Sequence, residues 1–168
     1  KNKNIKGVVF DLGYSLSQMK DNNKGLSFNS TGELNMRLGM NNFSAKDAIN
    51  KLESYDIEKI FKYFGEEKDS KLISRKIVNQ RKDKCLLTED LVEIINTTKK
   101  NFSKKNKSTK VFQALRIIVN NEISELLTGL SKSCNLISKN GKIITVTFHS
   151  IEDRICKSFF NSISSTNK

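Results

Sequence analysis

Residues 6–15 read KGVVFDLGYS, and this stretch organises the rest of the chain. A short apolar run, Val8 to Phe10, lies between Gly7 and a polar turn that begins at Asp11. Such a run is typical of a strand that is buried on both faces and ends in a turn. Open α/β sheets bind their ligands at that carboxyl end. The alternative is that Asp11 only satisfies hydrogen bonds of the turn.

The charge of the chain favours a polyanionic partner but does not identify one. Among the 168 residues, 30 Lys and Arg oppose 18 Asp and Glu, so the formal net charge is +12. A positive field of this kind attracts nucleic acid, although an ordinary protein from an AT-rich genome would show the same excess of lysine. No apolar run approaches the roughly 18 residues that a membrane span needs, so no membrane association is expected.

The cysteines predict neither a disulfide framework nor a metal site. Cys85, Cys134 and Cys156 are widely spaced, and His149 is the single histidine that could join them. This usage favours a reducing compartment, with the cytoplasm as the default. The chain starts at Lys1 rather than Met and enters a strand almost directly, so we expect a piece of a longer protein.

The middle of the chain is predicted to be mostly helical. Ser15 to Asn42 lacks a sustained helical period, and a long irregular segment of this kind is usually functional or mobile. From about Phe43 to Thr98, apolar residues recur at helical spacing and no strand is indicated. The predicted helix signals are Ser44 as an N-cap with Asp47 at the third helical position, Asp56 as a second N-cap, Gly65 as a stop, and Thr88 as a further N-cap.

A lysine-rich stretch separates these helices from the strongest helical signal. Lys99 to Lys110 carries six lysines, which suit phosphate contacts but equally suit a solvated linker. Val111 to Leu130 then keeps a helical period over several turns, in one long helix or two.

A second strand is predicted over Lys142 to Phe148, which is rich in β-branched residues. It ends at His149, and Ser150 is placed to cap a final helix. Because a helix followed by a parallel strand completes a crossover, the two strands are plausible neighbours in an α/β sheet. Asp11 and His149 would then lie at the same edge of that sheet.

Six motifs in a single order extend over nearly the whole chain and are together highly specific. They are DLGYSLSQ (11–18), GLSF (25–28), LNMR (34–37), FGEE (64–67), FQALRI with V-N and E (112–122), and FHSIEDR (148–154). In this order they resemble the bacterial small-subunit rRNA (cytosine-N4)-methyltransferase family.

The resemblance implies a partial class I, Rossmann-like methyltransferase fold with a helical insertion. Residues 1–24 and 108–168 would form the partial methyltransferase domain, and residues 25–107 the helical substrate-recognition insertion. The cofactor implied is S-adenosyl-L-methionine, with Asp11 and Gln18 at the family's cofactor-binding positions. The glycine-rich cofactor loop would lie upstream of Lys1, so the chain alone should bind the cofactor poorly and be inactive.

The implied reaction is N4-methylation of a cytidine in 16S-type small-subunit rRNA, free or in an assembling 30S subunit. The compartment would be the cytoplasm, or an organelle with bacterial-type ribosomes in a eukaryote. The candidate catalytic residues are Asp11, Ser15, Ser17 and His149. The candidate RNA-binding residues are Arg37, Lys104, Lys105, Lys107, Lys110 and Arg116. For His149 a positioning role is favoured over that of a general base. For Arg116 and Asn120, packing against the insertion is as plausible as RNA contact.

Three departures from the family pattern bear on activity. Asn35 stands where the family has a carboxylate, Lys110 stands where it has an arginine, and the turn after Asp11 lacks the usual proline. Lys110 keeps the charge but loses bidentate phosphate geometry. These departures, with the basic stretches, leave open an RNA-binding helical module without catalytic activity.

Overall fold

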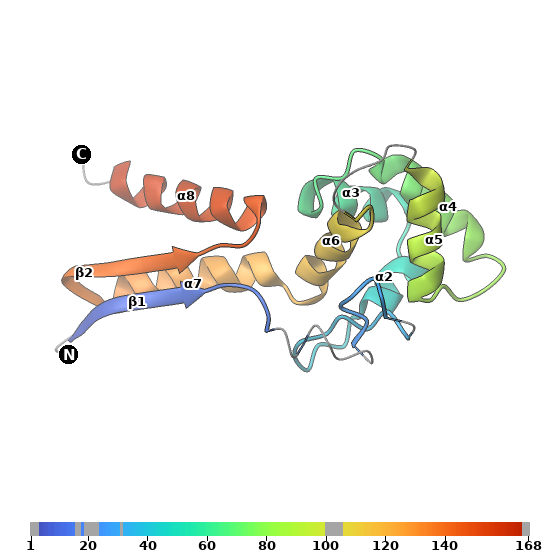
Figure 1. Ribbon diagram of the computed structural model, residues 1–168. Helices are drawn as coiled ribbons and strands as arrows, with labels where there is room; N and C mark the ends of the chain where they lie inside the picture. The colour runs from blue at the N-terminus through green and yellow to red at the C-terminus, as the bar shows by residue number, and fades with distance from the viewer. Residues whose placement is uncertain (1–3, 16–17, 19–23, 31, 100–105, 166–168) are drawn as a thin grey trace. The chain divides into compact units, whose positions relative to one another are not determined.

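The computed structural model describes residues 4–15, 18, 24–30, 32–99 and 106–165. These residues form a mixed α/β structure of two parallel strands and seven helices (Figure 1). They divide into two compact units, which we call the sheet unit (residues 1–14 and 123–168) and the helical unit (residues 15–122). Within the described ranges, no helix is both long and apolar enough to cross a membrane.

The sheet unit is built on two neighbouring parallel strands, as the sequence predicts. Strand β1 (Ile5–Asp11) pairs with β2 (Ile137–Val146), and β2 directly follows helix α7 (Glu122–Leu136). The predicted start of β2 at Lys142 is too late. The strand already pairs at Ile137, and a bulge follows in which β1 advances from Ile5 to Gly7 while β2 advances to Lys142. Asn140 takes φ 65° in this bulge, a conformation that asparagine tolerates well.

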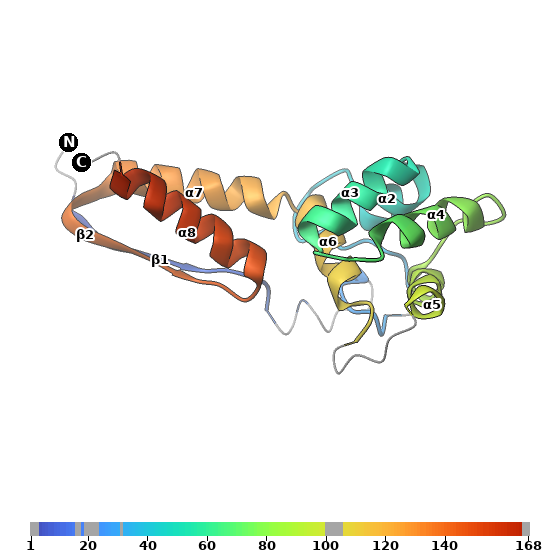
Figure 2. The same ribbon diagram turned by 90° about the horizontal axis from the view of Figure 1, so that it is seen from above.

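Both helices of the sheet unit, α7 and α8 (Ser150–Ser165), cover the same face of the two strands (Figure 2). Leu126, Leu130 and Cys156 are buried there and pack with Phe10 and Ile143. The close approach of α7 to β1 depends on Gly129, because a Cβ at that position would lie 2.9 Å from Cε1 of Phe10.

The opposite face of the sheet is apolar and exposed. Val9 is 66% exposed, Ile144 52% and Val146 43%. The prediction that β1 is buried on both faces is therefore wrong for this chain. Parallel sheets normally bury both faces, and here the described residues supply cover for one.

In the described part of the helical unit, five helices pack around one apolar core. They are α2 (Ala45–Lys51), α3 (Ser54–Phe64), α4 (Ser70–Gln80), α5 (Thr88–Thr98) and α6 (Thr109–Val119). The helical period predicted from Val111 to Leu130 is thus two helices, α6 and α7, with Asn121 at φ 51° between them. The domain boundaries predicted at residues 24–25 and 107–108 remain a prediction, and α6 packs within the helical unit.

The start of α2 confirms the predicted capping box. Ser44 Oγ accepts a hydrogen bond from the Asp47 backbone N–H at 3.2 Å, and Asp47 Oδ2 accepts from the Ser44 N–H at 2.9 Å. The Lys51 ammonium and the Ser44 hydrogen bonds hold the pKa of the Asp47 carboxyl well below its usual range. Asp47 therefore stabilises the fold above the ordinary pKa of an aspartate, and this contribution is lost as the pH falls through the lowered value.

Two other predicted N-caps are wrong. Helix α3 begins at Ser54, so Asp56 lies in its first turn, where a carboxylate still favours the helix dipole. Thr88 is the first residue of α5, and its hydroxyl donates to the carbonyl of Gly32 at 2.6 Å. The Thr88 hydroxyl, which the local pattern predicted to cap the helix, therefore binds a group that is distant in sequence. Gly65 ends α3 as predicted.

The segment that lacked a helical period is a structural part of the helical core. Leu34 and Met36 are fully buried, and Leu26 is 7% exposed. The backbone folds back on itself here, because the Met36 N–H donates to the Lys24 carbonyl at 2.6 Å. Gly25 makes this reversal possible with φ 59°.

Asn120 joins this irregular segment to the end of α6. Its Oδ1 accepts from the Leu38 N–H at 2.8 Å, and its Nδ2 donates to the Met36 carbonyl at 2.9 Å. One side chain therefore satisfies two backbone groups that have no helix or strand to pair with.

Replacing Asn120 with Ala is expected to lower the free energy of unfolding by about 1–3 kcal/mol, because both backbone groups lose their partner. Urea denaturation followed by circular dichroism measures this loss. Asn96→Ala, at an exposed position of α5, is the control and should change stability by no more than about 0.5 kcal/mol. Equal stability of the two variants would contradict the proposal that the Asn120 hydrogen bonds stabilise the irregular segment.

Candidate functional site

The carboxyl edge of the sheet unit carries the residues around which the prediction was built. Asp11 is the last residue of β1 and pairs with Val146, the last residue of β2. The Leu12 N–H still donates to the Val146 carbonyl at 3.2 Å, so the two strands end together. The Asp11 side chain is exposed, and among the described residues it has no hydrogen bond or ion pair. Its carboxylate is available to a ligand at this edge.

The turn after β1 packs against the turn after β2. Gly13 has φ 106°, a conformation that side chains other than hydrogen rarely allow. A Cβ on Gly13 would lie 3.4 Å from Cδ2 of Phe148. The glycine of the Asp-Leu-Gly turn therefore serves both the backbone conformation and the contact between the two turns.

His149 lies at the same edge and directly precedes helix α8. Its backbone carbonyl accepts from the Asp153 N–H at 3.2 Å, and its ring Nδ1 accepts from the Glu152 N–H at 3.4 Å. In return, Glu152 Oε2 accepts from the Phe148 N–H at 3.0 Å. His149 thus performs the capping that was predicted for Ser150, which is instead the first residue of the helix.

The two ring nitrogens of His149 both face groups of this chain. Nε2 lies 3.1 Å from Glu152 Oε1, an ion-pair contact without the geometry of a hydrogen bond. Because Nδ1 accepts a backbone N–H, the neutral ring carries its proton on Nε2. These contacts support the positioning role that the sequence favoured for His149.

Ser15 and Gln18 form a small reciprocal turn in the helical unit. The Ser15 N–H donates to Gln18 Oε1 at 2.9 Å, and the Gln18 N–H donates to Ser15 Oγ at 3.3 Å. The remaining candidate of this turn, Ser17, lies outside the described residues. That Asp11 and this turn line one pocket remains a prediction.

Arg37 is held by two groups of its own segment. Its Nε donates to Asn35 Oδ1 at 2.7 Å, and its Nη1 donates to the Asn41 carbonyl at 2.9 Å. Asn35 Oδ1 also lies 3.3 Å from the Arg37 backbone nitrogen, which donates to it. The amide at position 35 therefore supplies the acceptor that a carboxylate would supply, without the charge.

Replacing Asn35 with Asp is expected to stabilise the fold by about 0.5–1 kcal/mol, because hydrogen bonds to a charged acceptor are stronger. The gain should be present above the ordinary aspartate pKa of about 4 and disappear as the pH falls below it. Urea denaturation at neutral and acidic pH measures it. Asn42→Asp, at an exposed position, adds the same charge without the arginine, and an equal gain there would contradict the expected pair with Arg37.

Arg116 is engaged by Glu122 rather than exposed to a ligand. Its Nε and Nη2 donate to the two carboxylate oxygens of Glu122 at 2.7 and 2.9 Å, and the residue is 9% exposed. This bidentate geometry is the strongest that an arginine makes with a carboxylate. Of the two roles that were left open, the contacts support packing.

The described lysines of the lysine-rich stretch have partners within the helical unit, and one of these partners is the buried carboxylate of Glu67. Lys99 Nζ lies 2.5 Å from Glu67 Oε2 and donates to the Lys107 carbonyl at 2.6 Å. Lys107 Nζ donates back to the Lys99 carbonyl at 2.6 Å, and Lys110 Nζ donates to the Glu66 carbonyl at 2.8 Å. Lys104 and Lys105 lie outside the described residues.

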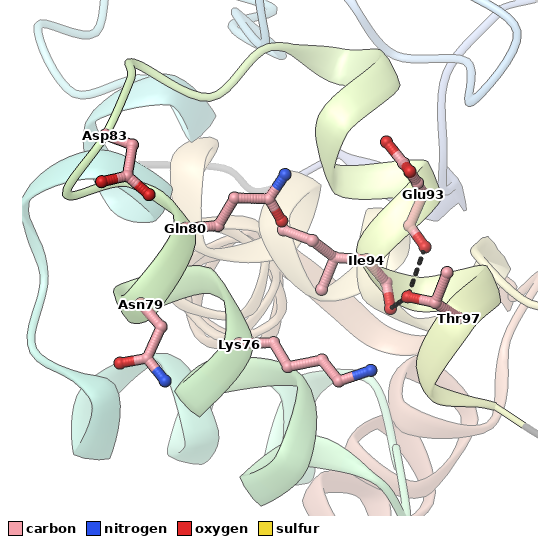
Figure 3. Close-up of a pocket in the computed structure, with 7 residues that line it drawn as sticks. All are labelled: Lys76, Asn79, Gln80, Asp83, Glu93, Ile94 and Thr97. Atoms are coloured by element: carbon pink, nitrogen blue, oxygen red, sulfur yellow. Dashed lines mark hydrogen bonds between the residues drawn. The ribbon is translucent and has the colours of Figure 1, made fainter.

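One hollow of the helical unit is lined by none of these residues. It has a volume of about 320 Å³ and lies between α4 with its following turn and α5 (Figure 3). Lys76, Asp83 and Glu93 line it with charges of both signs. Thr97 on its wall donates its hydroxyl to the Glu93 and Ile94 carbonyls. This lining favours no single class of ligand.

From the sequence, Glu67 had no assigned structural role, and for Asn120 packing against the insertion and RNA contact were both open. Asn120 and Glu67 each bind partners that are more than thirty positions away, so no local spacing reveals them. Both residues lie inside motifs of the family pattern. Their position in these motifs was the signal from which a structural contact could have been predicted.

Comparison with known proteins matches the whole chain to one family. The model of the MraW methylase family matches residues 1–168. Three relatives carry the name ribosomal RNA small subunit methyltransferase H. The protein of Wigglesworthia glossinidia brevipalpis is 44% identical over 158 residues, 92% of this chain and 51% of the relative. That of Wolbachia from Brugia malayi is 41% identical over 162 residues, 95% and 49%. That of Sinorhizobium fredii is 39% identical over 159 residues, 93% and 47%.

The chain spans about half the length of these relatives. The family model, in contrast, matches every residue of this chain. The motifs at the sheet edge, the irregular segment and α6 all fall within it. The chain belongs to the MraW methylase family.

Proposed function

We propose that this chain is part of a methyltransferase that transfers a methyl group from S-adenosyl-L-methionine to N4 of a cytidine in small-subunit rRNA. The observation that carries the proposal is the family match over residues 1–168, with relatives that are named as rRNA small subunit methyltransferases. The parallel strands that end together at Asp11 and Val146 support it, because α/β sheets place their chemistry at that edge.

The exposed sheet face supports a larger Rossmann-like domain. Val9, Ile144 and Val146 present apolar surface on the face that α7 and α8 leave open. In a class I methyltransferase both faces of the central sheet are covered, and further strands lie beside these two. The half of the relatives that this chain does not match has the length to supply them.

The residues of this chain fit a share of the cofactor site. Asp11 offers an exposed carboxylate at the end of a parallel strand, which suits hydrogen-bond donors or the positive charge of the cofactor. Gln18 is the second proposed contact. When bound, S-adenosyl-L-methionine supplies an electrophilic methyl group on its sulfonium.

The side chains of this chain would orient the target amine. The lone pair of a cytosine N4 amine is delocalised into the ring, so the site must align the nitrogen and accept its hydrogen bond as charge develops. Asp11, Ser15 and Ser17 supply oxygens for this purpose. His149 holds the start of α8 and thereby positions the turn that contains Phe148.

The basic residues would hold the RNA. Lys107 donates to the backbone carbonyl of Lys99, and Lys110 donates to that of Glu66. Phosphate contacts from Lys104, Lys105, Lys107 and Lys110 would give affinity without reading sequence. Arg37 completes the proposed set, whereas Arg116 has its bidentate partner in Glu122. The proposed compartment is the cytoplasm, or an organelle with bacterial-type ribosomes, where the substrate is a free rRNA or an assembling 30S subunit.

A chimera tests the proposal directly. In it, this chain replaces the matching half of the Wigglesworthia glossinidia brevipalpis relative. We expect transfer of a labelled methyl group from S-adenosyl-L-methionine to small-subunit rRNA, at N4 of a cytidine in the digested product. RNA binding without any methyl transfer would instead favour the non-catalytic RNA-binding module, and labelling of another base would contradict the cytosine assignment.

A further inference from the structure

The outer face of α3 carries two exposed tyrosines and two exposed lysines. Tyr55 is 64% exposed and Tyr63 is 60% exposed, and Lys59 and Lys62 are exposed between them. We call these four residues the tyrosine–lysine face. The opposite side of the helix buries its apolar residues in the core of the helical unit.

The four residues form one continuous stripe. Tyr55, Lys59 and Tyr63 follow each other at four-residue spacing, which places them on one side of a helix, and Lys62 lies beside them. Each lysine lies over a ring. Lys59 Nζ is 4.1 Å from the centroid of Tyr55, and Lys62 Nζ is 5.6 Å from that of Tyr63.

Folding alone does not account for this face. An aromatic ring that stays mostly in water contributes little hydrophobic stabilisation, and the cation–π contacts of exposed pairs are worth about 0.5–1 kcal/mol. Single exposed aromatics are common on protein surfaces. Two tyrosines along one helix, each paired with a lysine, are instead the combination that binds single-stranded nucleic acid, because the rings stack on bases and the cations contact phosphates.

The spacing of the two rings fits unpaired RNA. Eight residues of α-helix separate Tyr55 from Tyr63 by about 12 Å, given the rise of about 1.5 Å per residue. This is well beyond the roughly 3.4 Å between stacked neighbours in a regular strand, so the two rings would take bases that are not adjacent in a stack. A paired helix would present no free base face to either ring. Asp56, in the first turn of α3, is a nearby acidic group on this side.

We propose that the tyrosine–lysine face of α3 binds an unpaired segment of RNA. Tyr55 and Tyr63 stack on its bases, and Lys59 and Lys62 contact its phosphates. The inference rests on the proposed function in taking RNA as the substrate. It goes further by assigning an RNA-contacting surface outside the lysine-rich stretch and by requiring that the bound segment be single-stranded.

Tyrosine fluorescence tests the stacking. The chain has no Trp, and its tyrosines are Tyr14, Tyr55 and Tyr63. In a Tyr14→Phe variant all tyrosine emission therefore comes from the tyrosine–lysine face. We expect an oligouridylate of about eight nucleotides, within the usual site size, to quench this emission. A duplex RNA of equal charge and an oligoglutamate of equal charge should quench it far less, because neither presents unstacked bases.

Affinity measurements with the same oligouridylate separate the tyrosines from the lysines. Tyr55→Ala with Tyr63→Ala should lower the affinity at least about fivefold for each ring, with an unchanged dependence on salt. Lys59→Gln with Lys62→Gln should reduce the slope of log K against log salt by about 0.7 for each lysine. Lys71→Gln with Arg75→Gln, at exposed positions of α4, removes the same charge elsewhere and should leave both quantities close to those of the parent chain.

The outcomes distinguish this inference from the proposed function. Binding of the oligouridylate that is unaffected by the tyrosine changes, or equally reduced by the α4 control, overturns the inference while RNA remains the substrate. Equal affinity for oligoglutamate also overturns it and indicates an acidic protein partner. No RNA binding by the parent chain or by the chimera contradicts both. Circular dichroism of each variant shows that the exposed substitutions leave the fold intact.

Discussion

Replacing Asp11 with Asn in the chimera is expected to reduce methyl transfer by about 100-fold or more. Loss of one well-placed electrostatic contact in an active site commonly has an effect of this size. Asn keeps the shape of the side chain and removes its charge, so the loss should appear mainly as weaker binding of S-adenosyl-L-methionine. Labelled methyl transfer at varied cofactor concentration measures it, and calorimetric titration measures cofactor binding separately.

The structure makes this variant easy to interpret. The Asp11 side chain is exposed and has no partner among the described residues, so Asp11→Asn should change the free energy of unfolding by no more than about 0.5 kcal/mol. Asp83→Asn, at an exposed position after α4, is the matched control and should retain full activity. Unchanged cofactor affinity in the Asp11 variant would remove this residue from the proposed site.

Replacing Gly25 with Ala is expected to lower the free energy of unfolding by about 3–5 kcal/mol. The residue has φ 59°, which costs an alanine roughly 1–2 kcal/mol. The added Cβ would also lie 2.5 Å from the Glu33 carbonyl oxygen, so the backbone reversal that brings Leu34 and Met36 into the core must shift. Loss of that packing adds a cost of the size seen for disturbed cores.

Gly39→Ala provides the matched control in the same irregular segment. A Cβ at Gly39 would meet no atom within 4 Å, so its effect should stay within about 0.5 kcal/mol. Urea denaturation of both variants measures the difference. If Gly25→Ala is as stable as the parent chain, the described reversal between Lys24 and Met36 does not carry the stability assigned to it.

Local signals were sufficient for several interactions whose partners lie close in sequence, although they misplaced the N-caps of α3 and α8. The capping box of Ser44 and Asp47, the stop at Gly65 and the periodic apolar faces of the helices are all interactions within a few positions, and the structure confirms them. The pairing of β1 with β2 was also predicted, because each strand had its own composition and a crossover requires parallel neighbours. The order of the motifs was sufficient to indicate the family, which the comparison over residues 1–168 confirms.

Predictions from local sequence failed where a group distant in sequence binds the polar atoms of a residue. Thr88 gives its hydroxyl to the carbonyl of Gly32, which is 56 positions away. Asn120 holds the irregular segment from the far end of α6. The spacing of residues in the sequence does not indicate such pairs, because the two partners come close to each other when the core packs.

The identities and order of the residues were enough to indicate an α/β chain of this family with Asp11 at the end of its first strand. The tertiary structure decided the partners of individual side chains: Arg116 binds Glu122, and Arg37 binds Asn35. It also decided that the tyrosine–lysine face and one side of the sheet are exposed to solvent. The physical reason is that chemical type and periodicity are local properties, whereas the partner of a polar group and the exposure of an apolar one depend on which surfaces the packed chain brings together.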